Sequence, residues 1–158
     1  MKTIRLQEVP AEERSSPKGL YHLFQKNLSL VLGGKKDAGP AAGGHPFDVA
    51  WVSVPVGCKN WPVHRHSAQW EFYFVLAGNG RYFDGTEWNE IRAGQAVLTA
   101  PGEEHQIENR GTGDLVYLVI ADMPVADVIA YPATGLAFVK PERQFVRPTS
   151  VNYYDGHE

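Results

Sequence analysis

The sequence predicts an all-β fold, either a sandwich or a small barrel, and three observations support this prediction. Seven short runs are rich in β-branched and aromatic residues, which suit a pleated, half-buried sheet. Turn signals such as Asp84-Gly85 and Gly111-Thr-Gly113 separate these runs. Short strands at close, regular spacing are typical of sandwiches and barrels. The predicted strands are residues 47–54, 70–77, 80–83, 87–91, 96–100, 106–109 and 115–121.

The predicted strands divide the chain into a barrel core of residues 47–123 with an extension on either side. Residues 1–46 are expected to form an N-terminal extension and flexible loop. Within it, residues 19–33 lack a clean hydrophobic period, which indicates a short helix or strand packed on the outside of the barrel. Residues 33–46 are rich in Gly, Ala, Lys and Pro and predict a mobile loop that acts as a lid or a spacer.

Residues 124–158 form a C-terminal extension that is expected to pack on the barrel or on a second subunit. Its first part, residues 126–132, has the character of a turn-rich link. Two short strands are predicted after this link, at residues 136–140 and 144–147, and a polar tail follows them.

Composition excludes several classes of protein. The 158 residues are enough for one domain with a substantial core, and 43% hydrophobic with 21% charged residues is ordinary for a soluble globular protein. A formal net charge of −3 gives no basic surface for nucleic acid. No run is long and apolar enough for a membrane span, and the N-terminus is too polar for a signal peptide. We therefore expect a cytoplasmic protein without nucleic-acid or membrane partners, and its single cysteine, Cys58, excludes an internal disulfide.

Four potential metal ligands stand out: His64, His66, Glu71 and His105. Alternate residues of a strand point the same way, so His64 and His66 can aim at one point while Arg65 faces elsewhere. Imidazole and carboxylate ligands suit Zn, Mn, Fe, Ni and Cu, and this set leaves open positions on an ion that prefers five or six ligands. A His-x-His pair alone occurs by chance on exposed strands, so the full set indicates the metal site.

The first run of these residues resembles the first sequence pattern of the cupin superfamily. After the pair of His64 and His66, Glu71 follows four intervening residues, and Gly78 follows six more. The spacer from Gly57 to His64 is one residue longer than in the family pattern. This departure falls in a turn, so it should change the shape of the loop and leave the direction of the ligands intact.

The second run resembles the second cupin pattern. Gly102 is followed by His105 after two residues and by Asn109 after three more, although Pro101 abuts Gly102 where the family pattern has one residue between them. The resemblance implies a double-stranded β-helix, the jelly-roll barrel of cupins, with one divalent metal ion inside it. The metal could be Zn, Mn, Fe or Ni. The implied ligands are His64, His66, Glu71 and His105.

Residues 45–135 are further similar to small single-domain cupins of the cupin 2 type, a group often described as sugar-phosphate or mannose-6-phosphate isomerases. In cupins with such a C-terminal extension, the tail resembles strands that close the barrel or cross to a second subunit. Together with the apolar faces of the predicted strands, this resemblance leads us to expect a homodimer.

Strand parity predicts the remaining residues of the pocket. Tyr73 should face the same side as Glu71, and Ile107 and Asn109 the same side as His105. Hydrogen bonds that orient metal ligands are therefore expected from Tyr73, Asn109 and Gln69.

No catalytic residue can be assigned from the sequence. Glu103 and Glu104 precede a predicted metal ligand at the barrel mouth, and they and Tyr73 are candidates for proton transfer. Exposed turn carboxylates are more often only solvated charge, and a strand tyrosine is more often part of the core.

Three classes of function stay open, so whether the protein is an enzyme is undecided. The first is metal-assisted isomerisation or epimerisation of a sugar or sugar phosphate. The second is dioxygenase-like or decarboxylase-like chemistry at Fe, Mn or Ni, and the third is binding or sensing of a small molecule without turnover. The ligand is a small molecule in each case, and fold alone does not choose among them.

Overall fold

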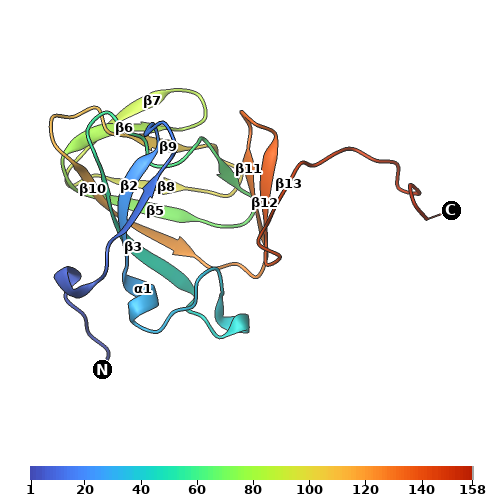
Figure 1. The fold of residues 1–158 in the computed structure, drawn as a ribbon, viewed down its shortest axis with the longest axis horizontal. Coiled ribbons are helices and arrows are strands. Elements are labelled where there is room, and N and C mark those ends of the chain that lie inside the picture. The colour runs from blue at the N-terminus through green and yellow to red at the C-terminus, as the bar shows by residue number, and fades with distance from the viewer. Residues whose placement is uncertain (158) are drawn as a thin grey trace.

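The computed structural model of the protein describes residues 1–157, which fold mainly into antiparallel strands (Figure 1). The strands are β1 (Glu12–Ser15), β2 (His22–Asn27), β3 (Phe47–Val54), β4 (Arg65–His66), β5 (Glu71–Ala77), β6 (Asn79–Phe83), β7 (Trp88–Arg92), β8 (Ala96–Thr99), β9 (Gln106–Glu108), β10 (Leu115–Asp122), β11 (Asp127–Tyr131), β12 (Leu136–Lys140) and β13 (Gln144–Val146). The helices are α1 (Leu28–Val31) and the 3-10 helices η1 (Leu6–Glu8) and η2 (Pro40–Ala42).

The barrel core matches the sequence-based expectation closely. The seven predicted strands correspond to β3 and to β5 through β10, and each boundary lies within one residue of its predicted place. The all-β prediction is therefore confirmed. The alternation in β5 is also as expected, because Tyr73 and Val75 are buried while Phe72 and Phe74 are exposed.

Two sheets enclose the core. The six-stranded sheet has the order β1-β2-β3-β10-β5-β8, and the three-stranded sheet has the order β7-β6-β9. Buried side chains from both sheets form one apolar cluster, in which Tyr117 and Val75 come from the larger sheet and Tyr82 and Ile107 from the smaller one. This core fixes the strands on which the metal-ligand candidates lie.

The N-terminal segment contributes more to the barrel than its sequence suggests. Residues 12–27 provide β1 and β2, and β2 pairs with β3 inside the six-stranded sheet. Leu23 of β2 is fully buried in the core cluster, so this segment is not merely packed on the outside. The irregular hydrophobic pattern hid the strand, because most residues of β2 are only half-buried.

The segment expected to be a turn-rich link is in fact a strand. β11 covers Asp127–Tyr131 and pairs with both β12 and β4, giving a four-stranded sheet of order β13-β12-β11-β4. The apolar and β-branched residues of this run favour a strand once β4 and β12 supply partners on either side. The C-terminal strands thus close on the barrel of the same chain, and the tail beyond them extends away from it (Figure 1).

One outer face of the six-stranded sheet is apolar and exposed. Trp70, Phe72 and Leu76 of the β5 region are 45%, 36% and 42% exposed, and Leu98 and Ile120 are 58% and 37% exposed. Phe72 lies opposite both Leu98 and Ile120 in the register, so these side chains form one continuous patch. Patches of this kind often mark interaction surfaces.

Within residues 1–157, no helix reaches the length and apolar character that crossing a membrane requires.

The burial of Leu23 gives a direct test of the role of the N-terminal strands. Leu23→Ala should lower the free energy of unfolding by about 2–5 kcal/mol, because it opens a cavity in a packed core. Urea denaturation measures this change. Leu20→Ala, at a residue that is 48% exposed, is the matched control and should change stability by less than about 0.5 kcal/mol. Equal effects of the two substitutions would show that β2 is peripheral to the core.

Candidate metal centre

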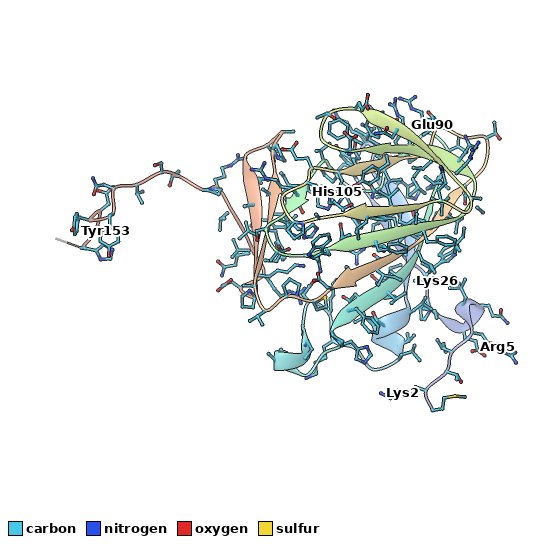
Figure 2. The ribbon with its side chains drawn as sticks, turned by 180° about the vertical axis from the view of Figure 1, so that it is seen from behind. Lys2, Arg5, Lys26, Glu90, His105 and Tyr153 are labelled. Atoms are coloured by element: carbon cyan, nitrogen blue, oxygen red, sulfur yellow. The ribbon has the colours of Figure 1, made fainter. Side chains whose placement is uncertain are left out.

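Four side chains that can ligate a metal ion converge inside the barrel. His64, His66, Glu71 and His105, here called the metal-ligand cluster, each offer one atom, and these atoms lie within 4.8 Å of one another. His66 lies in β4 and Glu71 begins β5, while His64 and His105 directly precede β4 and β9. The three His side chains are buried. Figure 2 shows His105 on the side of the barrel that faces the C-terminal strands.

Backbone hydrogen bonds hold the two ligand-bearing runs together. The amide of His105 donates to the carbonyl oxygen of His64 over 2.9 Å, and the amide of His64 donates back over 3.3 Å. The amide of Gly102 donates to the carbonyl oxygen of His66 over 2.7 Å. Gly102 has φ +90°, a conformation that other residues rarely adopt, so glycine is required for this turn. Residues distant in sequence thereby become neighbours.

Each imidazole is fixed through its Nδ1 atom. The Nδ1 atoms of His64 and His105 lie 2.9 and 3.2 Å from backbone carbonyl oxygens, and that of His66 lies 2.6 Å from Oδ2 of Asp127. A carbonyl or carboxylate oxygen only accepts, so each Nδ1 donates the hydrogen. The Nε2 atoms consequently face the cluster, which is the arrangement that metal-ligating histidines use.

The Glu71 carboxylate supplies the negative charge of the cluster. Its Oε2 atom accepts a hydrogen bond from the hydroxyl of Tyr73 over 2.8 Å and lies 2.8 Å from Nε2 of His105. Burial alone would raise the pKa of Glu71, but the contact with His105 and the other imidazoles hold this pKa below its ordinary range. Glu71 is therefore ionised, as a metal ligand must be.

The protonation of the surrounding groups suits the same role. Burial, together with the neighbouring His105, lowers the pKa of His64 from 6.5 to about 4, although Glu71 acts in the opposite direction. Burial would raise the pKa of Asp127, but its hydrogen bond with His66 outweighs this and lowers it below the ordinary range. A neutral His64 and an ionised Asp127 are the forms that favour metal binding.

A two-part cavity adjoins the cluster. The outer cavity, of about 470 Å³, is lined by His64 and His66 among others, and the inner cavity, of about 160 Å³, reaches down to Tyr73. Glu71 lines both parts, so the metal-ligand cluster lies at their junction. A cation held there would be reachable by a small molecule.

Two of the residues expected around the ligands lie beside them. Tyr73 bonds Glu71 directly. Gln69 is buried and lines both cavities, although its side-chain amide donates to the carbonyl oxygen of Asp122 and not to a metal ligand.

The other two residues lie elsewhere. Asn109 donates to the carbonyl oxygens of Val54 and Gly113 and accepts from the amide of Gly111, so it organises a turn. Ile107 is part of the apolar core and offers no polar atom from its side chain. Strand parity placed both side chains inside the protein but could not tell which polar group each would meet.

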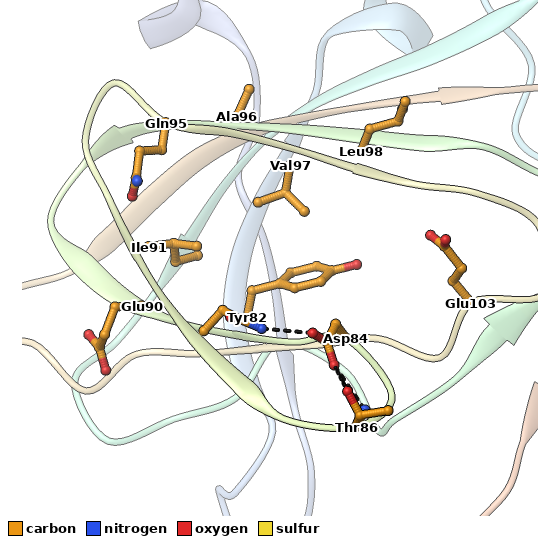
Figure 3. A pocket seen from close by; sticks show the side chains of 11 residues that line it. Tyr82, Asp84, Thr86, Glu90, Ile91, Gln95, Ala96, Val97, Leu98 and Glu103 are labelled. Atoms are coloured by element: carbon orange, nitrogen blue, oxygen red, sulfur yellow. Dashed lines mark hydrogen bonds between the residues drawn. The ribbon is translucent and has the colours of Figure 1, made fainter.

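The candidate bases Glu103 and Glu104 do not line the two-part cavity. Glu104 pairs with Arg65 over 3.3 Å on the outside, as expected for an arginine that points away from the ligands. Glu103 accepts from the amide of Ala100 and lines a separate cavity of about 560 Å³ (Figure 3). Tyr82 separates this cavity from the cluster, since its ring lines the cavity and stacks on His105 with centroids 6.3 Å apart.

Sequence reasoning missed several residues of the site. Asp127 accepts hydrogen bonds from His66, Ser67 and the amide of Ala68, although the sequence predicts a turn-rich link at its position. Tyr131 stacks on His64 with ring centroids 6.0 Å apart and lines the outer cavity. The strand character of residues 127–131 was the one available signal, because no local spacing connects Asp127 with His66.

The hydrogen bond between Asp127 and His66 predicts an effect on metal affinity. Asp127→Asn keeps the size of the side chain but removes the charge that orients and polarises the imidazole, so metal affinity should fall about 10–100-fold. Competition against a fluorescent chelator measures this change. Asp114→Asn, at an exposed aspartate that accepts from Ser53, is the control and should leave the affinity unchanged. Unaltered affinity in Asp127→Asn would remove Asp127 from the site.

Comparison with known proteins agrees with this picture. Residues 50–121 match the family model Cupin_2, described as "Cupin domain". The oxalate-binding protein of Thermotoga maritima is 38% identical over 71 residues, which cover 45% of this chain and 58% of that protein. The chain therefore spans less than two thirds of the length of the curated relatives it matches.

Solved structures give the fold. A sugar phosphate isomerase from a cupin superfamily of Silicibacter pomeroyi aligns with a TM-score of 0.74 at 19% identity, over 96% of this chain and 98% of that chain. A predicted oxalate decarboxylase from Thermotoga maritima aligns with a TM-score of 0.64 at 26% identity, over 78% and 100% of the two chains. Residues 50–121 therefore carry a cupin domain, and the chain shares the double-stranded β-helix fold of these cupin structures.

Proposed function

We propose that this protein is a metal-dependent isomerase or epimerase that acts on a sugar or sugar phosphate. One observation carries the proposal: the metal-ligand cluster opens onto a cavity whose lining suits a hydroxylated, anionic molecule. The inner cavity is lined by amide side chains, including Gln25, Asn27 and Gln69, which can both donate to and accept from hydroxyl groups. The outer cavity adds the aromatic faces of Trp61 and Tyr131.

The residues of the cluster would hold one divalent cation. Such an ion, when bound, supplies Lewis-acid polarisation of a carbonyl or hydroxyl oxygen. The chain contributes three imidazoles fixed through Nδ1, together with an ionised carboxylate. It also limits the access of bulk water from below, since Tyr73 and Tyr117, which line the inner cavity, are buried.

Proton transfer would depend on groups that line the cavity. Burial, together with the nearby charge of Glu71, raises the pKa of Tyr73 well above its ordinary value, so Tyr73 keeps its proton and acts as a donor. Glu103 and Glu104 do not line the cavity, and Asp48 accepts from Ser29. We therefore assign Asp37, which lines both parts of the cavity, as the acceptor of a carbon-bound proton.

Binding or decarboxylation of oxalate or a similar dicarboxylate is the second candidate function. It is favoured by the 38% identity to the oxalate-binding protein of Thermotoga maritima. A dicarboxylate could bind a cation through two oxygen atoms, but it leaves the amide-lined inner cavity without a partner. The likeness to the sugar phosphate isomerase is one of fold alone, so the chemistry of the cavity decides our preference.

The test is exchange of carbon-bound hydrogen. The metal-loaded protein should catalyse incorporation of deuterium from D₂O into mannose 6-phosphate at the carbon next to the carbonyl, and a new isomer should appear. NMR measures both changes. His64→Ala combined with His105→Ala should abolish both exchange and bound metal, whereas Arg92→Gln, on β7 outside the two-part cavity, should retain both.

Two results would contradict the proposal. Absence of exchange across a panel of aldose and ketose phosphates would remove the isomerase function. Release of CO₂ from oxalate, or tight oxalate binding without turnover, would establish the second candidate instead.

We further propose that the protein forms a homodimer through the apolar outer face that includes Phe72, Leu98 and Ile120. A two-fold interface presents the same patch from both subunits, and burial of this face would remove exposed apolar side chains from water. Light scattering after gel filtration should give twice the chain mass of 17.5 kDa, and Phe72→Glu should give the monomer. Val56→Glu, at a separate exposed position, is the control, and a monomeric wild-type protein would refute the dimer.

A further inference from the structure

The outer cavity carries an excess of positive charge. Four cationic side chains line it, whereas its carboxylates are Asp37 and the metal-ligand candidate Glu71. The cations come from three separate parts of the chain: β1, the loop before β3, and the end of β12 with the turn after it. They are Arg14, Lys36, Lys140 and Arg143. A metal cation in the neighbouring cluster would add to this charge, so the cavity is suited to an anion.

Arg14 has a donor that lacks an acceptor. Among residues 1–157, the Nε atom of Arg14 is buried and has no hydrogen-bond partner. Its Nη2 atom pairs with Glu12 over 2.8 Å, and its guanidinium lies 5.9 Å from the ring centroid of Trp61, which also lines the cavity. An unpaired buried donor is costly, and the Arg14 side chain as a whole is 36% exposed, so an anion in the cavity can reach the guanidinium and supply the missing acceptor.

Arg143 is paired with a carboxylate that a ligand could replace. Its Nη2 atom lies 3.3 Å from Oδ2 of Asp37. This ion pair connects the turn after β12, which carries Arg143, with the loop before β3, which carries Asp37. The Arg143 side chain is 51% exposed, and an ion pair this exposed contributes little to stability. Both residues have positive φ angles, +58° and +54°, a conformation that non-glycine residues adopt mainly where their surroundings impose it.

Lys140 connects the cationic group to the metal-ligand cluster. Its side chain is only 12% exposed, lines both cavities, and places Nζ 4.0 Å from Oδ2 of Asp127, the partner of His66. A small molecule whose anionic group contacts Lys140 would therefore lie next to the metal-ligand cluster.

We propose that Arg14, Lys140 and Arg143 form an anion subsite beside the metal centre, which binds the phosphate or carboxylate group of the ligand. Without this ligand Asp37 forms an ion pair with Arg143, and the anion of the ligand displaces Asp37 when it binds. Arginine suits the role because its planar guanidinium binds phosphate and carboxylate through paired hydrogen bonds. The inference deepens the proposed function and rests on it for the identity of the rest of the ligand. Displacement would also free Asp37, the carboxylate that we assign to proton transfer.

The experiment titrates inorganic phosphate into the chelator-treated full chain at low ionic strength by calorimetry, so that no metal contributes to anion binding. Arg14→Gln and Arg143→Gln should each weaken binding about tenfold, since each removes a charged hydrogen-bond donor. Asp37→Asn should tighten binding about fivefold, because it removes the competing carboxylate, and asparagine tolerates positive φ. Arg92→Gln, which removes an arginine outside the cavity, should bind as the wild type does.

Tighter binding by Asp37→Asn cannot result from misfolding, so this variant keeps the test valid if an arginine variant folds poorly.

A parallel titration with acetate identifies the group that the subsite binds. Higher affinity for phosphate than for acetate assigns the subsite to a phosphate ester, and higher affinity for acetate assigns it to a carboxylate. The proposal is overturned if neither anion saturates the protein, or if both arginine variants and Asp37→Asn bind like the wild type. Anion binding that responds to the variants, without any carbon-bound exchange, would overturn the isomerase function and leave the subsite standing.

Discussion

The metal centre depends on the fixed orientation of three imidazole rings. A histidine side chain that is free to rotate loses conformational entropy when it binds an ion, and it can present either nitrogen atom. Here the Nδ1 atoms of His64, His66 and His105 are each held by an oxygen atom of the protein. The packed barrel therefore holds three Nε2 atoms and one carboxylate so that they point toward a single position.

This arrangement explains why distant parts of the chain are needed. β11 carries Asp127 and pairs with β4, which places the carboxylate next to His66. The N-terminal strands add Gln25 and Asn27 to the inner cavity and Arg14 to the outer one. The segments before and after the cupin domain thus contribute little to the metal-ligand cluster itself but much of the wall that a ligand would meet.

The sequence predicted the parts of the structure that local pattern controls. Strand periodicity located β3 and β5 through β10, and the alternation of His64 and His66 and the resemblance of the run to a cupin pattern identified the ligands that converge with Glu71, although β4 and β5 lie in different sheets. It could not predict Asp127 or Arg143, because their contacts join segments far apart in the chain and no spacing rule connects them. Strand parity is also limited in what it predicts. Asn109 is inside the protein as expected, yet its side-chain amide forms hydrogen bonds with backbone atoms of Val54 and Gly111 and not with a metal ligand.

The most direct test of the metal centre is anomalous diffraction from crystals of protein purified without an affinity-column metal, combined with elemental analysis of the same sample. The account predicts one divalent ion per chain, bonded to the Nε2 atoms of three His residues and to a Glu71 oxygen at about 2.0–2.2 Å. An ion located elsewhere, or none after soaking with Zn, Mn, Fe or Ni, would contradict it.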